Sequence, residues 1–448
     1  MKNIKFNNLW DSLNSSFWFV PSVMVFLAIA LSFLTIGIDQ NQKTNLIGEL
    51  GWAYTLGPSG SRAILSAIAS SMMSVATTAF SITIVALQLA SSQFGPRLLR
   101  NFMQDRGNQI VLGTFISTFV YSLMVLRTIN GSEEHEFVPH LAVTCGIGLA
   151  IASIGVLIYF IHHSASSIQV DRVIQLVGGE LDDAIDRLFP ESIGTSKAKN
   201  KQQDNPSDIS AEIPANFEED ARPIPAINGG YIQAINDRQL MQIAIEHNLL
   251  LQILQRPGRF TVEGSELAQV FPGKQVNDEL ASKINSAFLI GSQRTEQQDV
   301  EFSIDQLVEI AVRALSPGIN DPFTAIRCID QLSAALCRLT QREIPSPYRY
   351  DDSNQLRMIA EPIAFADVID AAFNQIRQNG RSNVAVTMRL LETIAVVARF
   401  TDRTTHRKAL RRHADLTERS SQQATLDELD RKDIQERYLA ALKAIDLD

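Results

Sequence analysis

The chain has 448 residues, of which 45% are hydrophobic and 20% are charged, and its formal net charge is -9. Residues 1–165 carry only 8 of the 40 basic and 7 of the 49 acidic side chains, whereas residues 166–448 carry a net charge of -10. This division excludes a single globular domain and indicates a membrane part followed by an acidic soluble part, which argues against a nucleic-acid-binding protein because phosphate recognition needs a basic surface.

Four apolar segments predict transmembrane helices, at about residues 17–38, 63–92, 109–127 and 138–161. Each has about the 20 residues that a helix needs to cross the hydrocarbon core, so we expect a transmembrane domain over residues 1–165. Basic residues cluster before the first span and between the second and third, whereas the loop at 133–136 is acidic. Because cytoplasmic loops are enriched in Lys and Arg, both termini are expected in the cytoplasm.

The second predicted span is unusually long and carries an ordered polar row. Thirty-four uncharged residues separate Arg62 from Arg97, and as one helix they would extend about 50 Å. At about 100° per residue, the polar side chains fall within about 40° of one line. The row consists of Ser66, Ser70, Ser74, Thr77, Ser81, Gln88 and Ser92.

Such a row has two physical uses, and the sequence leaves both open. Hydroxyls permit close helix packing with interhelical hydrogen bonds, or they line a pore and contact water and weakly hydrated ions. In a pore, Arg97 and Arg100 would form the cytoplasmic mouth. Apart from Arg127, the last residue of the third, the predicted spans contain no acidic or basic residue, so any permeation is expected to be passive.

The rest of the chain predicts an α+β cytoplasmic region, so the fold class is mostly α. Its expected parts are an amphipathic stalk helix (166–189), a flexible linker (190–222), a small β module (223–298), a helical domain (299–400) and a charged helical tail (401–448). The β module resembles the barrel-sandwich fold of biotinyl and lipoyl carriers. A carrier needs a lysine on an exposed hairpin, and residues 231–273 contain none, so we do not expect a carrier role.

The sharpest local motif is the segment 316–324, which predicts a helix stop, a turn and a helix restart. Gly318 would supply the permissive backbone, Asp321 the N-cap and Pro322 the first helical position. The alternative is that Asn320 and Asp321, beside the helix N-terminus, bind a small ligand or ion.

Motifs that carry known chemistry are absent from the sequence. The three Cys are scattered and the seven His are dispersed. No nucleophile elbow, zinc-binding helix, phosphate-binding loop or dinucleotide fingerprint occurs. We therefore predict no catalytic residue, cofactor or metal site, and the sequence does not favour an enzyme.

Several strings together resemble one family. They cover residues 79–94, 96–103, 159–163, 296–302 and 315–325, and they are similar to the signature of the bacterial membrane proteins designated domain of unknown function 2254. The resemblance extends over about residues 10–400. It implies a multi-span protein of the bacterial plasma (inner) membrane with a cytoplasmic domain, and it assigns no role to any residue.

These observations lead to two functional hypotheses. The first is a passive, channel-like homo-oligomer in the lipid bilayer with a cytoplasmic regulatory domain, motivated by the polar row. The alternative is a membrane-anchored adaptor or scaffold that binds a protein partner through its cytoplasmic domain.

Overall fold

The computed structural model describes residues 17–41, 57–95, 105–132, 135–167, 169–189, 213–425 and 427–446. The chain divides into two compact units, Met1–Val173 and Ile174–Asp448, which are described separately. Most of the predicted linker, together with Arg97 and Arg100, lies outside the described residues.

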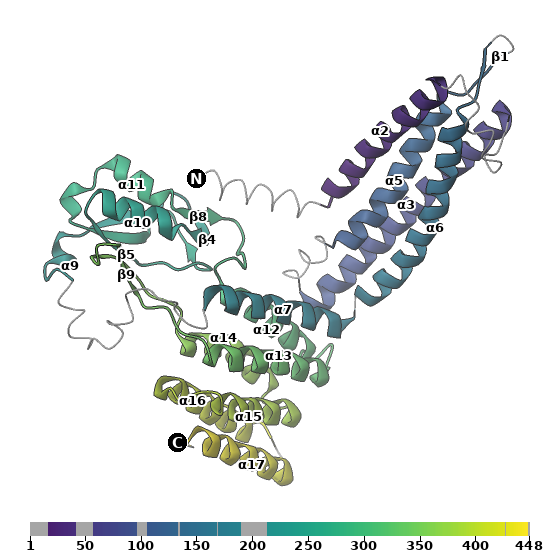
Figure 1. Ribbon diagram of the computed structural model, residues 1–448. Coiled ribbons are helices and arrows are strands. Elements are labelled where there is room, and N and C mark those ends of the chain that lie inside the picture. Colours follow the sequence, from purple (N-terminus) through teal and green to yellow (C-terminus); the bar gives the residue numbers. More distant parts are fainter. Residues whose placement is uncertain are drawn as a thin grey trace. The chain divides into compact units, whose positions relative to one another are not determined.

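The described residues of the first unit form four long helices and a short hairpin, followed by the start of α7 (Figure 1). The helices are α2 (Phe19–Asn41), α3 (Pro58–Phe94), α5 (Arg106–Leu126) and α6 (His140–Ser167), and the antiparallel hairpin pairs β1 (Asn130–Ser132) with β2 (His135–Phe137). All four helices are long and apolar enough to cross a membrane, which confirms the prediction of four candidate spans. Helix α5 is the central one, because it packs against α2, α3 and α6 and is the most buried of the four.

The side chain of Tyr121, on α5, is buried in this bundle, and its hydroxyl has hydrogen-bond partners on two other helices. Its hydroxyl donates to the backbone oxygen of Ala142 at 3.0 Å and lies 3.1 Å from Oγ1 of Thr35. A buried hydroxyl without such partners would cost several kcal/mol in an apolar environment. The two contacts therefore link α2, α5 and α6 at one point.

The second unit contains helices and two sheets. Its helices are most of α7 (Val170–Leu188), α9 (Phe217–Asp220), α10 (Asp237–Glu246), α11 (Asp278–Asn285), α12 (Val300–Ala314), α13 (Pro322–Thr340), α14 (Phe365–Gly380), α15 (Val384–Ala398), α16 (Thr404–Gln422) and α17 (Glu428–Ile445), with a 3-10 turn at Gly273–Gln275. Its strands are β3 (Arg222–Pro225), β4 (Gly230–Ile235), β5 (Leu250–Ile253), β6 (Phe260–Thr261), β7 (Glu266–Phe271), β8 (Phe288–Gly291), β9 (Tyr348–Tyr350) and β10 (Leu356–Ala360).

The strands form a five-stranded sheet in the order β3-β7-β5-β10-β9 and a three-stranded sheet in the order β6-β4-β8. Strand β10 runs parallel to β5, with Met358 opposite Leu251. Strands β9 and β10 lie within residues 299–400, which we predicted to be helical, so that prediction was incomplete. The two strands are short. Strand β9 pairs with β10, and β10 joins the sheet by pairing with β5, about 100 residues away, which local periodicity does not encode.

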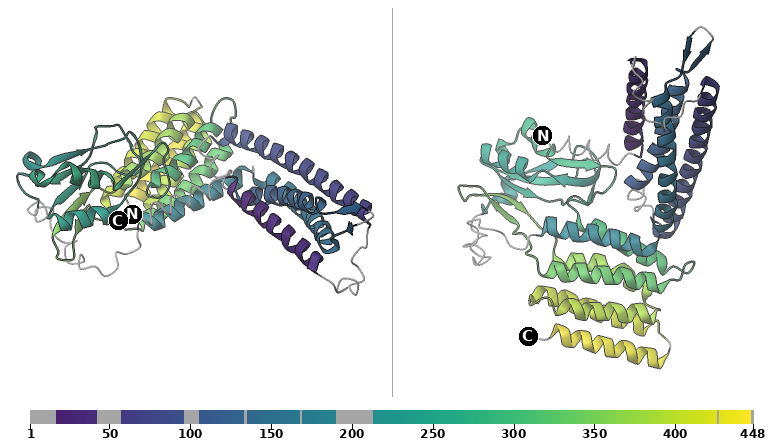
Figure 2. Two further views of the ribbon diagram at one scale, coloured as in Figure 1. Left: turned by 90° about the horizontal axis from the view of Figure 1, so that it is seen from above. Right: turned by 45° about the vertical axis from the view of Figure 1, so that its right-hand side comes forward.

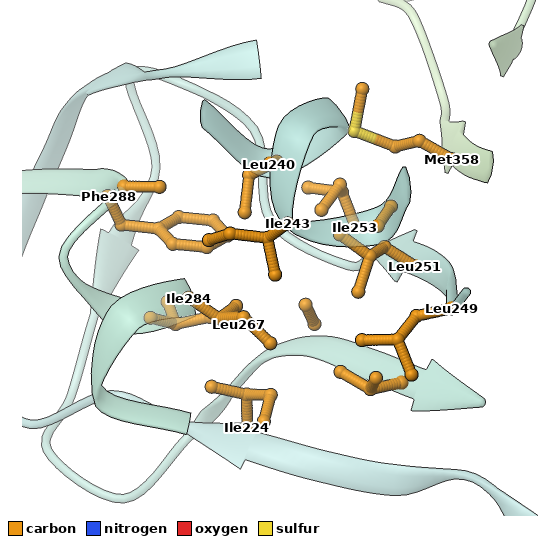
Figure 3. Close-up of a cluster of buried hydrophobic side chains, with 14 of the residues drawn as sticks. Ile224, Leu240, Ile243, Leu249, Leu251, Ile253, Leu267, Ile284, Phe288 and Met358 are labelled. Atoms are coloured by element: carbon orange, nitrogen blue, oxygen red, sulfur yellow. The ribbon is translucent and has the colours of Figure 1, made fainter. Parts of the chain in front are cut away.

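The core of the β-containing part lies between the sheets and two short helices (Figure 3). Figure 3 shows Leu240 and Ile243 of α10 beside Leu251 and Leu267 of the sheet. All four side chains are buried.

Helices α12 to α17, together with α7, form stacked layers (Figures 1 and 2). On α7, Leu181 and Ile185 face the same small cavity as Leu332 and Leu336 of α13. Helix α16, in the predicted charged tail, also packs on the bundle. Its His413 is fully buried, and its Nε2 lies 2.8 Å from a carboxylate oxygen of Asp370 on α14.

A buried ion pair lies immediately before α12. Nε of Arg294 donates to a carboxylate oxygen of Asp299 at 2.9 Å, and the same guanidinium pairs with Asp305. Burial raises the pKa of Asp299, and the Arg294 charge opposes that rise. Gly258 approaches the Asp299 carboxylate so closely, at φ +86°, that a Cβ at this position would collide with it. Only glycine suits this backbone conformation and this contact.

Candidate functional site

Helix α3 is the longest of the membrane helices and presents two different faces. Its 37 residues extend about 55 Å, well beyond a hydrocarbon core of about 30 Å. One face is buried within the first unit by small and apolar side chains, including Leu65, Ala69, Ala76 and Ala79. The face packs against α5 and α6, as small residues at helix interfaces generally do.

The predicted polar row lies on the opposite side of α3. Ser66, Ser70, Ser74, Thr77, Ser81, Gln88 and Ser92 are all exposed in the single chain. At about 100° per residue, the row is centred roughly 145° away from the buried face. The row is therefore not used to pack α3 against the other described helices of its own chain.

Several hydroxyls of this row donate to the backbone of their own helix. Ser70 donates to the oxygen of Ala67 at 3.1 Å, and Ser81 donates to the oxygen of Thr77 at 2.8 Å. Thr77 makes the same kind of bond, to Met73 at 2.9 Å. Because a hydroxyl has one donor and two acceptor lone pairs, the bond uses the proton and leaves the oxygen able to accept. The face consequently presents a line of acceptor oxygens.

The exposed faces of α2 and α6 differ sharply from that of α3. On α2, Phe26, Leu27 and Phe33 are exposed, and on α6 the exposed side chains include Ile154 and Ile158. Large apolar side chains of this kind suit contact with lipid tails, whereas small hydroxyl residues are typical of helix interfaces and water-lined surfaces. Only α3, among the described membrane helices, exposes a long row of hydroxyls.

The row is not uniform along the helix. From Ser66 to Ser81 its neighbours are mostly small or hydroxylated, with Met73 and Phe80 exposed at one edge. Farther along the helix, Ile84, Val85 and Leu89 are exposed beside Gln88. We therefore define the hydroxyl face as Ser66, Ser70, Ser74, Thr77 and Ser81. The predicted mouth residues Arg97 and Arg100 follow this helix and lie outside the described residues.

The structure places Asn320 and Asp321 in a tight turn between α12 and α13. Asp321 accepts a hydrogen bond from the backbone nitrogen of Thr324 at 3.2 Å and another from the Thr324 hydroxyl at 2.6 Å, which lowers the pKa of its carboxyl. Gly318 was expected to supply the permissive backbone of this turn, and the residue with a positive φ is Asn320, at 51°. Asn tolerates this conformation better than most residues. The Asp321 carboxylate thus acts as the N-cap of α13.

Charged side chains at the helix ends were missed by the sequence analysis. The helices extend past the predicted spans, so Asp39 lies in the last turn of α2 and Arg62 lies near the start of α3. Asp39 accepts hydrogen bonds from the backbone nitrogens of Leu141 and Ala142, at 3.2 and 3.0 Å, and caps α6. Arg62 donates to the oxygen of Ile129 at 2.7 Å.

A second missed contact joins α5 and α6. Asp105 caps α5 through Gly107, at 2.7 Å, and its other oxygen lies 2.7 Å from Nε2 of His163. A cap position directly before an apolar run is visible in sequence, but its histidine partner is not. Among the described residues, no group of three or more His, Cys, Asp and Glu side chains could hold a metal ion.

Four apolar helices of membrane-spanning length, followed by a unit with two sheets and a helical bundle, define a multi-span helical membrane protein. The chain belongs to the family of predicted membrane proteins DUF2254, which it matches over residues 14–396. It is 32% identical over 427 residues to the uncharacterized proteins Mb1321c of Mycobacterium bovis and Rv1290c of Mycobacterium tuberculosis, a match that covers 94% of this chain and 79% of each relative. No solved structure matches the chain.

Proposed function

We propose that the protein is a passive channel-like oligomer in which the hydroxyl face of α3 lines a water-filled path between copies of the chain. The observation that carries this proposal is the exposure of Ser66, Ser70, Ser74, Thr77 and Ser81 on the side of α3 that its own bundle does not cover. One helix per chain cannot enclose a path by itself. Several copies are therefore required, each contributing one hydroxyl face.

The acceptor oxygens of the hydroxyl face determine which solutes could cross the membrane along this path. Acceptor oxygens replace part of the hydration of a small cation or an uncharged polar solute, without the ionisable side chains of a proton relay. In this proposal the membrane is the bacterial inner membrane, both termini are cytoplasmic, and the second unit regulates passage. A barrel-sandwich-like arrangement of the β module belongs with these predictions.

Flux through reconstituted protein tests the proposal. We expect vesicles that contain the full-length chain to release potassium ions or a small polar solute such as glycerol faster than protein-free vesicles. The rate should depend linearly on the concentration gradient, as passive passage requires. If neither ions nor small polar solutes cross faster than in protein-free vesicles, the proposal is wrong.

A second function is favoured by a different observation on the β-containing part. Phe260 and Val262, two residues apart in the chain, are exposed there at 60% and 59% of their surfaces, and Ile227 is exposed at 55%. Exposed apolar patches are typical of protein-binding surfaces. The chain would then be a membrane-anchored adaptor. A protein partner that co-purifies in equal amounts, and is lost after Phe260→Ser, would support this alternative, whereas unchanged purification as a homo-oligomer would count against it.

A further inference from the structure

The turn between α12 and α13 exposes two large apolar side chains. Phe323 is 74% exposed and Ile319 is 48% exposed. The turn is held by backbone hydrogen bonds, from Asn320 to Ser316 at 2.9 Å and from Asp321 to Ala314 at 2.8 Å. Because these bonds fix the backbone of the turn, the positions from which its side chains project are also fixed. We call Ile319 and Phe323 the apolar tip.

The register of α7 against α13 shows which end of the bundle carries the tip. Gly178 packs so closely on Gln331 that a Cβ there would lie 2.7 Å from the Gln331 Oε1, and Nε of Arg338 donates to Asp186 at 2.9 Å. The two contacts fix α7 and α13 as parallel helices. Eight residues before Gly178 and Gln331, about 12 Å along each helix, lie the start of α7 at residue 170 and the tip residue Phe323.

The short connection between α6 and α7 limits how far this end of the bundle can lie from the fourth candidate span. The fourth candidate span ends at Ser166 and α7 begins at Val170. Four residue steps extend at most about 14 Å. The start of α7, and with it the apolar tip at the same level of the bundle, is therefore held close to the end of the fourth candidate span.

Basic side chains accompany the tip. Arg327 follows Phe323 by one helical turn and is exposed. Arg381, also exposed, follows Gly380, where a Cβ would lie 3.3 Å from the side chain of Leu315 at the base of the turn. Guanidinium groups beside an aromatic and an aliphatic side chain are the composition of surfaces that bind anionic membranes.

From these contacts we propose that the apolar tip inserts into the headgroup region of the bilayer, with Arg327 and Arg381 against anionic lipid headgroups. The occupant is lipid rather than protein because two side chains offer far less than the roughly 800 Å² per partner that a stable protein interface buries. The insertion would fix the second unit against the membrane independently of whether solutes pass.

Lipid quenching of a tryptophan at the tip tests this inference in the full-length chain. The native Trp10, Trp18 and Trp52 are first replaced by Phe, and Phe323→Trp is then introduced. The protein is reconstituted into vesicles of phosphatidylcholine and phosphatidylglycerol, part of which are brominated near the glycerol backbone. We expect blue-shifted emission that the brominated lipid quenches by roughly half, as insertion to a shallow depth implies.

Phe400→Trp in the same background is the matched control. Phe400 is 48% exposed and follows α15. Gly380 lies close both to Val386 at the start of α15 and to Leu315 before α13, and Nε of Arg389 contacts Asp330 farther along the two helices, so α15 runs parallel to α13. Phe400 therefore lies at the far end of the bundle, and its replacement should stay accessible to aqueous acrylamide and unquenched by lipid.

Two results would overturn the inference. Emission from Phe323→Trp that acrylamide quenches as fully as that from Phe400→Trp, with no effect of brominated lipid, would place the tip in water. Emission shielded from both quenchers would place it against protein. Ile319→Trp provides an independent measurement on the same tip, should Phe323→Trp perturb the turn.

Discussion

Replacing Asp299 by alanine should lower the free energy of unfolding of the second unit by about 3 kcal/mol, because breaking a buried ion pair leaves an uncompensated charge. The Asp299 side chain is only 3% exposed, and two nitrogens of Arg294 contact the same oxygen, at 2.7 and 2.9 Å. Asp305 remains beside Arg294 after the change. The expected loss of stability therefore lies at the lower end of the range that is usual for breaking a buried ion pair. The measurement is pulse proteolysis of the full-length chain in increasing urea.

Asp305→Ala is the matched control, since it removes the other partner of the same guanidinium. The Asp305 side chain is 29% exposed, so its loss should cost about 1 kcal/mol or less. Tryptophan emission should not change in either variant, because Trp10, Trp18 and Trp52 all belong to the first unit. Equal sensitivity of the two variants to urea would show that the buried pair of Arg294 and Asp299 does not stabilise the second unit more than the pair of Arg294 and Asp305 does.

The largest functional effect is expected from Ser70→Leu, Ser74→Leu and Ser81→Leu combined. These side chains are exposed in the single chain and contact none of its other described helices through their own hydroxyls. Leucine also favours membrane insertion and helix formation. The variant should therefore insert and fold, but lose its acceptor oxygens and narrow the path, and solute flux should fall by about tenfold or more.

The control places leucines on the lipid-facing side instead. Ile151→Leu, Ile154→Leu and Ile158→Leu change three exposed positions of α6 while preserving their volume, so flux should stay at the level of the unmodified protein. Normal flux in the triple serine variant would mean that the hydroxyl face is not part of the path.

The sequence predicts well those features that arise from neighbouring residues. The apolar runs define α2, α3, α5 and α6, and the helical spacing of the serines identifies one face of α3. The N-cap at Asp321 follows from its place before Pro322. In each case the partner lies within a few residues along the chain, where helix geometry fixes the relation between side chains.

Features that depend on distant partners could not be predicted. Strand β10 pairs with β5 across about 100 residues, and Asp105 meets His163 only after α5 and α6 have packed. The burial of Asp299 depends on the loop at Gly258. Such contacts are set by tertiary packing, which neither hydrophobic periodicity nor local propensity specifies. The exposure of the hydroxyl face also required the structure, because a polar row alone does not show which side its bundle covers.

The central claim, that the hydroxyl face of α3 is in contact with water, is tested most directly by thiol accessibility. Ser74→Cys and, separately, Ile154→Cys are made in a chain whose three native cysteines are alanine, and each is treated with a charged, water-soluble thiosulfonate. Because these reagents react with the thiolate, which forms in water and not in lipid, Ser74→Cys should react and its flux should fall, whereas Ile154→Cys should remain unmodified. Failure of Ser74→Cys to react, with its flux unchanged, would place the face against lipid or dry protein and contradict the account.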